Sequence, residues 1–239
     1  VNLTAAASGS TLIGSIAADT ISGGAGADTI NGNGGNDIID AKAGNDVVTY
    51  NFSAASIEGG AGDDTLILPY GTVYDLSNST NQVTGTTIVH GFEHVVVLAA
   101  PSLNLVGDAS DNILTGGAGD DTLDGLGGND TLDGAGGADT VRGGDGNDRI
   151  VYDAADILED GGNGIDTLII SGTTTAAVNL SSTANQVSGG GQAINFESVD
   201  ASAVTTSLGL TGDAAANTLR GGSGNDTING QDGNDIIIG

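Results

Sequence analysis

The chain has 239 residues, of which 43 are glycine and 31 are aspartate or glutamate, against only four lysines and arginines. The formal net charge of −27 makes nucleic acid and anionic membrane surfaces poor partners, and no apolar run approaches the roughly 20 residues of a membrane span. Few aromatic residues and no cysteine leave neither a thick apolar core nor a disulfide framework, so multivalent cations are the component that such a chain needs in order to fold.

The first block, residues 1–67, contains a nine-residue repeat of the form G-G-x-G-x-D-x-U-x, where U is a large aliphatic residue. Its units begin at residues 14, 23, 32, 41, 50 and 59. One aliphatic residue in nine predicts a three-residue strand, x-U-x, joined to the next by a six-residue glycine-rich turn. The sixth positions hold the acids Asp19, Asp28, Asp37, Asp46 and Asp64.

Residues 68–106 form a tract without the nonamer that is rich in Val, Thr and Asn. Its β-like stretches are TVYDL, TTIVHGF and HVVVL. We interpret the tract as coils that continue or cap the repeat architecture, and a small separate β unit is the alternative.

The second block, residues 107–169, repeats the nonamer from units at 107, 116, 125, 134, 143, 152 and 161. A second tract, residues 170–211, matches the first, with GFEHVVV in one against NFESVDA in the other. Residues 212–239 begin a third block, so the chain iterates a module of roughly 100 residues. The sixth positions of these two blocks are Asn112, Asp121, Asp130, Asp139, Asp148 and Asp166, and Asn217, Asp226 and Asp235.

The regular spacing of the acids predicts a metal site. If successive nonamers turn on alternate sides of a flattened coil, two nonamers complete a coil and same-side turns stack at about 4.8 Å. The sixth-position carboxylates of units n and n+2 then converge, and carbonyl oxygens of both turns face the same gap. An all-oxygen shell without sulfur or imidazole suits calcium better than magnesium. The expected carbonyl ligands are Gly23, Gly26, Gly32, Gly35, Gly116, Gly119, Gly125, Gly128, Gly134, Gly137, Gly143 and Gly146.

The nonamers GGAGADTIN, GGAGDDTLD, GGDGNDRIV and GGSGNDTIN resemble the RTX, or haemolysin-type, calcium-binding repeats of bacterial proteins exported by type I secretion. The resemblance implies an all-β fold, a right-handed parallel β-roll or β-solenoid with about eight calcium ions in the glycine-rich turns, and folding outside the cell. Carried over to this chain, the ligand pairs are Asp19–Asp37, Asp28–Asp46, Asp46–Asp64, Asp121–Asp139, Asp130–Asp148 and Asp148–Asp166.

Several units depart from the pattern. The pairs Asn112–Asp130 and Asn217–Asp235 replace a carboxylate by an amide, and we expect weaker sites there. The units at 50 and 152 carry Ala55, Ile157 and Glu159 at pattern positions, which predicts deformed rungs. The tracts 68–106 and 170–211 are expected to be calcium-poor.

Two classes of function follow from these features. The first is a calcium-binding structural module of a secreted or cell-surface bacterial protein of the adhesin, S-layer or filament type, which is favoured by the iterated module. The alternative is the C-terminal folding and secretion domain of a type I-secreted protease, lipase or epimerase. No catalytic residues are predicted for the chain itself. The expected partners are calcium and either other domains of the parent chain or further copies joined head to tail, without membrane insertion.

Overall fold

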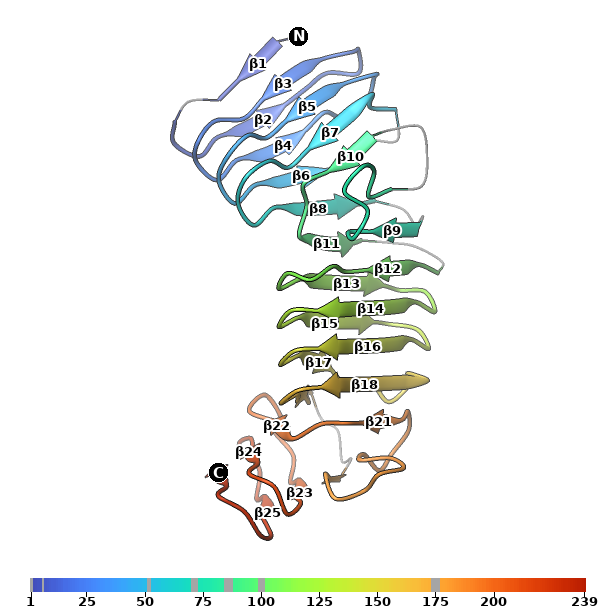
Figure 1. Ribbon diagram of the computed structural model, residues 1–239, viewed down its shortest axis with the longest axis vertical. Helices are drawn as coiled ribbons and strands as arrows, with labels where there is room; N and C mark the ends of the chain where they lie inside the picture. The colour runs from blue at the N-terminus through green and yellow to red at the C-terminus, as the bar shows by residue number, and fades with distance from the viewer. Residues whose placement is uncertain are drawn as a thin grey trace.

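The computed structural model describes residues 2–5, 7–50, 53–69, 73–83, 88–98, 102–172 and 177–239. These residues contain strands, turns and bends but no helix, and every named strand pairs with its neighbours in parallel. Figure 1 shows the strands stacked as rungs from the N-terminus at one end of the molecule to the C-terminus at the other. The chain is therefore a parallel β-solenoid of about 12 turns, and the parallel β-solenoid that the resemblance implied is confirmed.

One face of the solenoid is a single sheet that runs along the molecule. Its twelve strands, in spatial order, are β2 (Thr11–Ile13), β4 (Thr29–Asn31), β6 (Val47–Thr49), β8 (Thr65–Leu68), β11 (His94–Val97), β13 (Ile113–Gly117), β15 (Thr131–Ala135), β17 (Arg149–Val151), β19 (Thr167–Ile169), β22 (Ser198–Asp200), β24 (Thr218–Arg220) and β26 (Ile236–Ile238).

The opposite face consists of three shorter sheets. The first contains β1 (Asn2–Thr4), β3 (Thr20–Ser22), β5 (Ile38–Asp40), β7 (Ser56–Glu58) and β10 (Ile88–His90). The second contains β9 (Val73–Asp75), β12 (Asn104–Val106), β14 (Thr122–Gly127), β16 (Thr140–Asp145), β18 (Leu158–Asn163) and β21 (Ala193–Ile194). The third contains β20 (Val178–Asn179), β23 (Gly209–Thr211) and β25 (Thr227–Asn229).

The two tracts without nonamers lie within the solenoid. Strand β11 pairs with β8 on one side and β13 on the other, and β22 pairs in the same way with β19 and β24. Each tract therefore continues the long sheet and does not form a separate unit. Thr72, Thr86, Thr87 and Ala176, at the edges of the predicted β stretches, lie outside the described residues.

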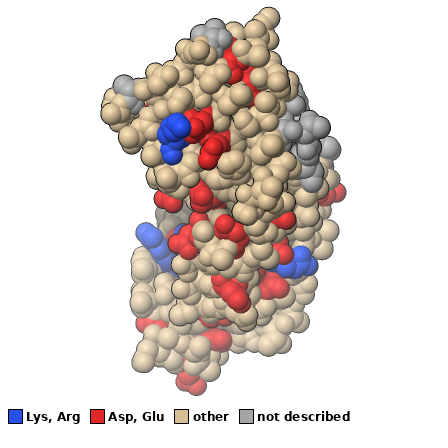
Figure 2. Space-filling view, turned by 45° about the horizontal axis from the view of Figure 1, so that its top comes forward, with Lys and Arg blue, Asp and Glu red and all other residues tan. Residues whose placement is uncertain are grey.

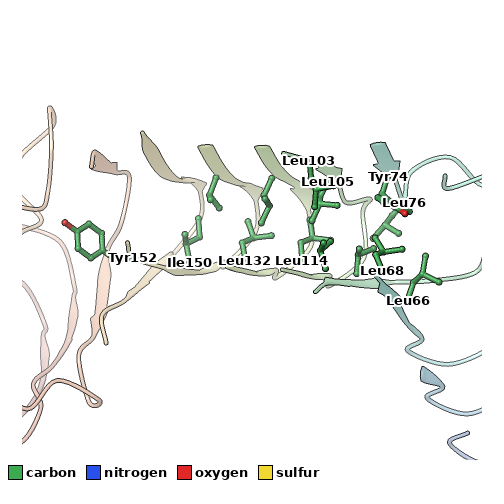
Figure 3. Packing of buried hydrophobic residues seen from close by; sticks show 14 of the residues in the cluster. Leu66, Leu68, Tyr74, Leu76, Leu103, Leu105, Leu114, Leu132, Ile150 and Tyr152 are labelled. Carbon is green, nitrogen blue, oxygen red and sulfur yellow. The ribbon is translucent and has the colours of Figure 1, made fainter. Parts of the chain in front are cut away.

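The core is a thin layer of aliphatic side chains between the two faces. The eighth-position residues of most nonamers are buried, because the middle residue of each three-residue strand points inward. Figure 3 shows such residues, including Leu66, Leu114, Leu132 and Ile150, in a row along the axis. Tyr50 and Tyr74 meet edge to face at 6.4 Å. The strands thus hold the turns in fixed register along both edges of the solenoid.

Candidate metal centres

The sixth-position aspartates lie one above another along the turns. In the regular units, Oδ1 of each aspartate accepts a hydrogen bond from the backbone N–H of the sixth-position residue two units earlier. Asp139 accepts from Asp121 at 2.7 Å and Asp148 accepts from Asp130 at 2.8 Å. The contact recurs between Asp19 and Asp37, Asp28 and Asp46, Asp46 and Asp64, Asn112 and Asp130, Asp148 and Asp166, and Asn217 and Asp235. The structure therefore brings together each sequence-predicted pair of same-side units.

The second carboxylate oxygen of most of these aspartates is buried without a hydrogen-bond partner. Such an oxygen is costly because burial removes its water and nothing replaces it. A bound cation or a proton satisfies it. The oxygens concerned are Oδ2 of Asp46, Asp64, Asp121, Asp130, Asp139, Asp148 and Asp166.

First-position glycines leave room for the Oδ2 atoms of the sixth-position aspartates. A Cβ on Gly14 would stand 2.7 Å from Asp19 Oδ2 and 2.7 Å from the carbonyl oxygen of Gly32, in the next same-side turn. A Cβ on Gly116 would stand 2.5 Å from Asp121 Oδ2 and 2.6 Å from the carbonyl oxygen of Gly134. Carboxylate and carbonyl oxygens of two successive same-side turns therefore converge where the glycine has no side chain. This donor set fits calcium.

The predicted carbonyl ligands divide by position in the nonamer. Carbonyl oxygens of first-position glycines lie against the first-position glycine of the preceding same-side turn, and those of fourth-position glycines lie against the fourth-position glycine of the following same-side turn. Both kinds border the gap between two same-side turns. The first group is Gly32, Gly125, Gly134 and Gly143, and the second is Gly26, Gly119, Gly128 and Gly146. The roles of Gly23, Gly35, Gly116 and Gly137 stay predictions.

Burial raises the pKa of the stacked carboxyl groups. The pKa rises to about 6 for Asp64 and Asp121 and to about 7 for Asp130 and Asp166, first because the groups lose water and then because another carboxylate lies close by. The pKa values of Asp46, Asp139 and Asp148 are also raised by burial. Without a cation, the stack therefore holds its negative charges at a cost in free energy.

The turns have two conformations. In the first, the sixth-position side chain binds the backbone of its own turn. In the units at 14, 23, 107, 212 and 221, a side-chain oxygen accepts a hydrogen bond from the second-position N–H of its own turn, as in Gly24 to Asp28 at 2.7 Å. None of these five units stacks on an earlier nonamer of the same side.

The other conformation places the second residue of the unit in the left-handed region. Non-glycine residues adopt it there at a cost of roughly 1 kcal/mol or more each. Each of them lies in a unit that follows an earlier nonamer on the same side, so the strained conformation belongs to turns stacked on another turn. These residues are Asn33 (φ 65°), Lys42 (φ 81°), Leu126 (φ 69°), Ala135 (φ 69°) and Gln231 (φ 67°).

The units at 50 and 152 depart from the regular turns. Ala55 donates its N–H to the carbonyl oxygen of Asp37, and no carboxylate stands at its position. Ile157 is exposed, and Asp156, one residue earlier, accepts the N–H of Asp139 at 3.1 Å. The nonamer pattern missed Asp156 because it considers only fixed positions. The sequence signal for Asp156 was an acid one residue before the sixth position of its unit.

Glu159 occupies an eighth position, where other units place an aliphatic residue. It is fully buried and pairs in register with Val141 and Ala193. Burial raises its pKa to about 8, and the nearby Asp156 carboxylate contributes to the rise in this pKa. Glu159 Oε2 and Asp156 Oδ2 are both buried without a hydrogen-bond partner.

Two further carboxylates extend the stack beyond the nonamers. Glu93 Oε2 accepts the N–H of Asp64 at 2.9 Å, and Glu197 Oε2 accepts the N–H of Asp166 at 2.8 Å. The pKa of each glutamate is raised by burial. The matched GFE and NFE of the two tracts were the sequence signal for these residues.

The two asparagines among the predicted ligands are held by the protein. Oδ1 of Asn112 accepts the N–H of Asp108 at 2.8 Å, and Oδ1 of Asn217 accepts the N–H of Asp213 at 2.8 Å. Asp226 accepts the N–H groups of Leu208 and Gly222, and Asp235 accepts that of Asn217. The weaker sites expected at the asparagines stay predictions.

The donor set is two carboxylates in the Asp–Asp gaps and one carboxylate with one amide in the Asn112–Asp130 and Asn217–Asp235 gaps, in each case beside backbone carbonyls. No group of three or more His, Cys, Asp or Glu side chains suited to a metal ion occurs within the described part of the chain. Nor do those residues contain a helix long and apolar enough to span a membrane. Acidic side chains are spread along the molecule in Figure 2, with few basic ones between them.

Comparison with known proteins agrees with this geometry. The family model described as RTX calcium-binding nonapeptide repeat (4 copies) matches residues 13–48, 56–68, 104–132, 124–156 and 211–239, which together exceed half of the chain. No curated protein matches the chain. Repeats of this family bind calcium. From its stacked nonamer turns and from this match, the chain belongs to the RTX calcium-binding nonapeptide repeat family.

Proposed function

We propose that the chain is a structural module of a secreted bacterial protein, of the adhesin, S-layer or filament type, which calcium stiffens outside the cell. The observation that carries the proposal is the twelve-stranded sheet, which continues through both tracts between the blocks. Because each coil of a solenoid contacts its neighbours, calcium in the gaps would reinforce the contacts that join successive coils along the axis.

Calcium acts in this proposal as the link between successive coils. Most of the buried Oδ2 atoms at the turns have no hydrogen-bond partner, and backbone carbonyls of the neighbouring turn lie beside them. A divalent cation in a gap between two aspartates neutralises both carboxylates, whereas in the two Asn–Asp gaps it meets one, and in every gap it joins unit n to unit n+2. The eight predicted pairs correspond to about eight ions per chain.

Force spectroscopy on single chains tests the structural role. We expect the chain to unfold at measurable force, coil by coil, in millimolar calcium and to extend without resistance in chelator. A calcium-loaded chain that extends as easily as the chelated one would contradict a load-bearing role.

The alternative role, as the folding domain of a secreted enzyme, requires a different result. The repeats of this family typically occur in type I-secreted proteins. If the module serves a neighbouring enzyme, its fusion to an unfolded reporter should accelerate refolding of that reporter in calcium. We propose that the module has no such effect and that it carries no catalytic activity of its own.

A further inference from the structure

We propose that Glu93 completes an additional calcium site with Asp64, after the last nonamer of the first block. Glu197 completes the equivalent site with Asp166, after the last nonamer of the second block. The inference rests on the proposed binding of calcium in the nonamer turns and extends it to turns that contain no nonamer. These two sites lie where the repeat pattern has already ended.

Each glutamate takes the position of a missing sixth-position aspartate. Glu93 Oε2 accepts the N–H of Asp64 at 2.9 Å, and Glu197 Oε2 accepts that of Asp166 at 2.8 Å. In a regular gap, Asp139 makes the same contact with Asp121 at 2.7 Å. The carboxylate of the glutamate therefore stands where the next carboxylate of the stack belongs.

The backbone completes the resemblance to a regular gap. In a regular gap, the carbonyl of a first-position glycine lies against the first-position glycine of the preceding same-side turn. Here the carbonyl oxygen of Gly91 lies against Gly59, and that of Asn195 lies against Gly161. Gly91 (φ 71°) and Asn195 (φ 58°) are both left-handed. A three-residue turn, Gly-Phe-Glu or Asn-Phe-Glu, thus presents the carbonyl and the carboxylate that a nonamer presents with six residues.

The facing aspartates each offer an unsatisfied oxygen. Asp64 and Asp166 are fully buried, and Oδ2 of each has no hydrogen-bond partner. Each Oδ1, in contrast, accepts the N–H of Asp46 or Asp148 in the turn before. The unpartnered Oδ2 belongs to a carboxylate that faces the glutamate carboxylate, and two carboxylates repel each other. A cation between them would remove this repulsion.

Both three-residue turns are held rigidly by a buried glutamine. Gln82 donates to the carbonyl oxygen of Phe92 at 2.9 Å and accepts the N–H of Phe92 at 3.1 Å. Gln186 makes the same two contacts with Phe196, both at 2.9 Å. The same fixed arrangement occurs in both modules, as a preformed ligand requires.

The asparagine in the first nonamer of the following block binds the backbone of each glutamate. Asn112 Nδ2 donates to the carbonyl oxygen of Glu93 at 2.9 Å, and Asn217 Nδ2 donates to that of Glu197 at 3.0 Å. An aspartate there would face this carbonyl without a proton to share. The glutamate side chain therefore contacts the last nonamer of the preceding block. Its backbone carbonyl accepts a hydrogen bond from the asparagine side chain of the following block.

The experiment counts calcium ions on the complete 239-residue chain. Wild type, Glu93→Gln, Glu197→Gln and the double variant are dialysed against fixed free calcium, and bound calcium is measured by elemental analysis. Glutamine keeps an oxygen that can accept the N–H of Asp64 or Asp166, so the fold is expected to survive, which circular dichroism checks. Glu58→Gln is the charge-matched control, because Glu58 is half-exposed on β7 beside His90.

We expect each single variant to bind one ion fewer, or to bind one ion at least tenfold more weakly, and the double variant to lose two. A double variant that binds as many ions as the control at the same free calcium overturns the inference. Calcium density between the Asp64 and Glu93 carboxylates in a crystal of the calcium-loaded wild type supports the inference without any variant, and density in the nonamer gaps alone refutes it. A wild-type chain that binds no calcium refutes the proposed function as well.

Discussion

In most of the stacked aspartates the two carboxylate oxygens have different roles. Oδ1 accepts a backbone N–H from the coil before and fixes the register, whereas Oδ2 of Asp46, Asp64, Asp121, Asp130, Asp139, Asp148 and Asp166 has no hydrogen-bond partner and is left for a ligand. Loss of one side chain therefore affects the gap on each side of it. The effect depends on whether both gaps contain a partner.

Asp130→Ala should weaken two calcium sites. Asp130 lies between Asn112 and Asp148 in the stack and contacts both. Asp226→Ala is the matched control, because Leu208 takes the place before Asp226 in the stack and offers no carboxylate. Calcium titration by calorimetry measures both variants. Equal losses of bound calcium from the two would disprove the pairing of units n and n+2.

Glu159→Gln should change the pH dependence of stability. The pKa of Glu159 is about 8 in the folded chain against 4.5 for an ordinary glutamate, so the folded state favours the protonated form. The stabilisation that this provides is complete below pH 4.5 and is lost as the pH rises through about 8. Glutamine does not ionise, so the variant should gain stability relative to wild type over this range, on the order of 3 kcal/mol.

Denaturant unfolding at pH 5 and pH 8.5, at constant saturating calcium, measures this difference. Glu58→Gln removes the same charge from a half-exposed position and serves as the control. Parallel pH profiles for wild type and Glu159→Gln would show that the buried carboxyl does not titrate as described.

At the scale of the single element, the turn has a strained and an unstrained form. The strained form occurs where a turn stacks on an earlier nonamer, and five non-glycine residues adopt left-handed conformations there. Strain of this kind persists only when the surroundings over-determine it. If calcium binds between stacked turns as proposed, its contacts would compensate this strain.

Ala135→Gly should stabilise the calcium-loaded chain by about 0.5–1 kcal/mol, because glycine adopts the left-handed conformation without a steric penalty. Ala135 is exposed and has a φ of 69°. Ala109→Gly makes the same change in an exposed turn without a positive φ and should be neutral or destabilising. Thermal unfolding in calcium compares them, and an equal shift in both variants would rule out strain at residue 135.

The nonamer spacing predicted the strands, the turns and most candidate ligands because each unit repeats the same geometry. It could not predict Asp156, which lies one residue out of register, or Glu93 and Glu197, which reach the stack from turns of three residues. Their positions depend on how the tracts fold back into the solenoid, and residue counting does not capture this. The buried Glu159 likewise appeared only as a break in the pattern.

At the scale of the whole molecule, the stabilisation from a thin apolar core competes with the repulsion among many negative charges. A thin layer of aliphatic side chains from both faces is buried between them, while the chain carries a net charge of −27. Many of its carboxylates are stacked in the turns, where burial raises their pKa values. Self-repulsion therefore opposes the fold until cations enter the gaps.

The dependence of folding on calcium tests this account most directly. Far-ultraviolet circular dichroism of the chain should show disorder in chelator and a cooperative gain of β signal as calcium rises, with a midpoint on the order of 10⁻⁴–10⁻³ M. Magnesium at the same concentrations should produce far less β signal, because it prefers a tight octahedral shell with its own waters. A β spectrum that is the same in chelator as in millimolar calcium would contradict the account.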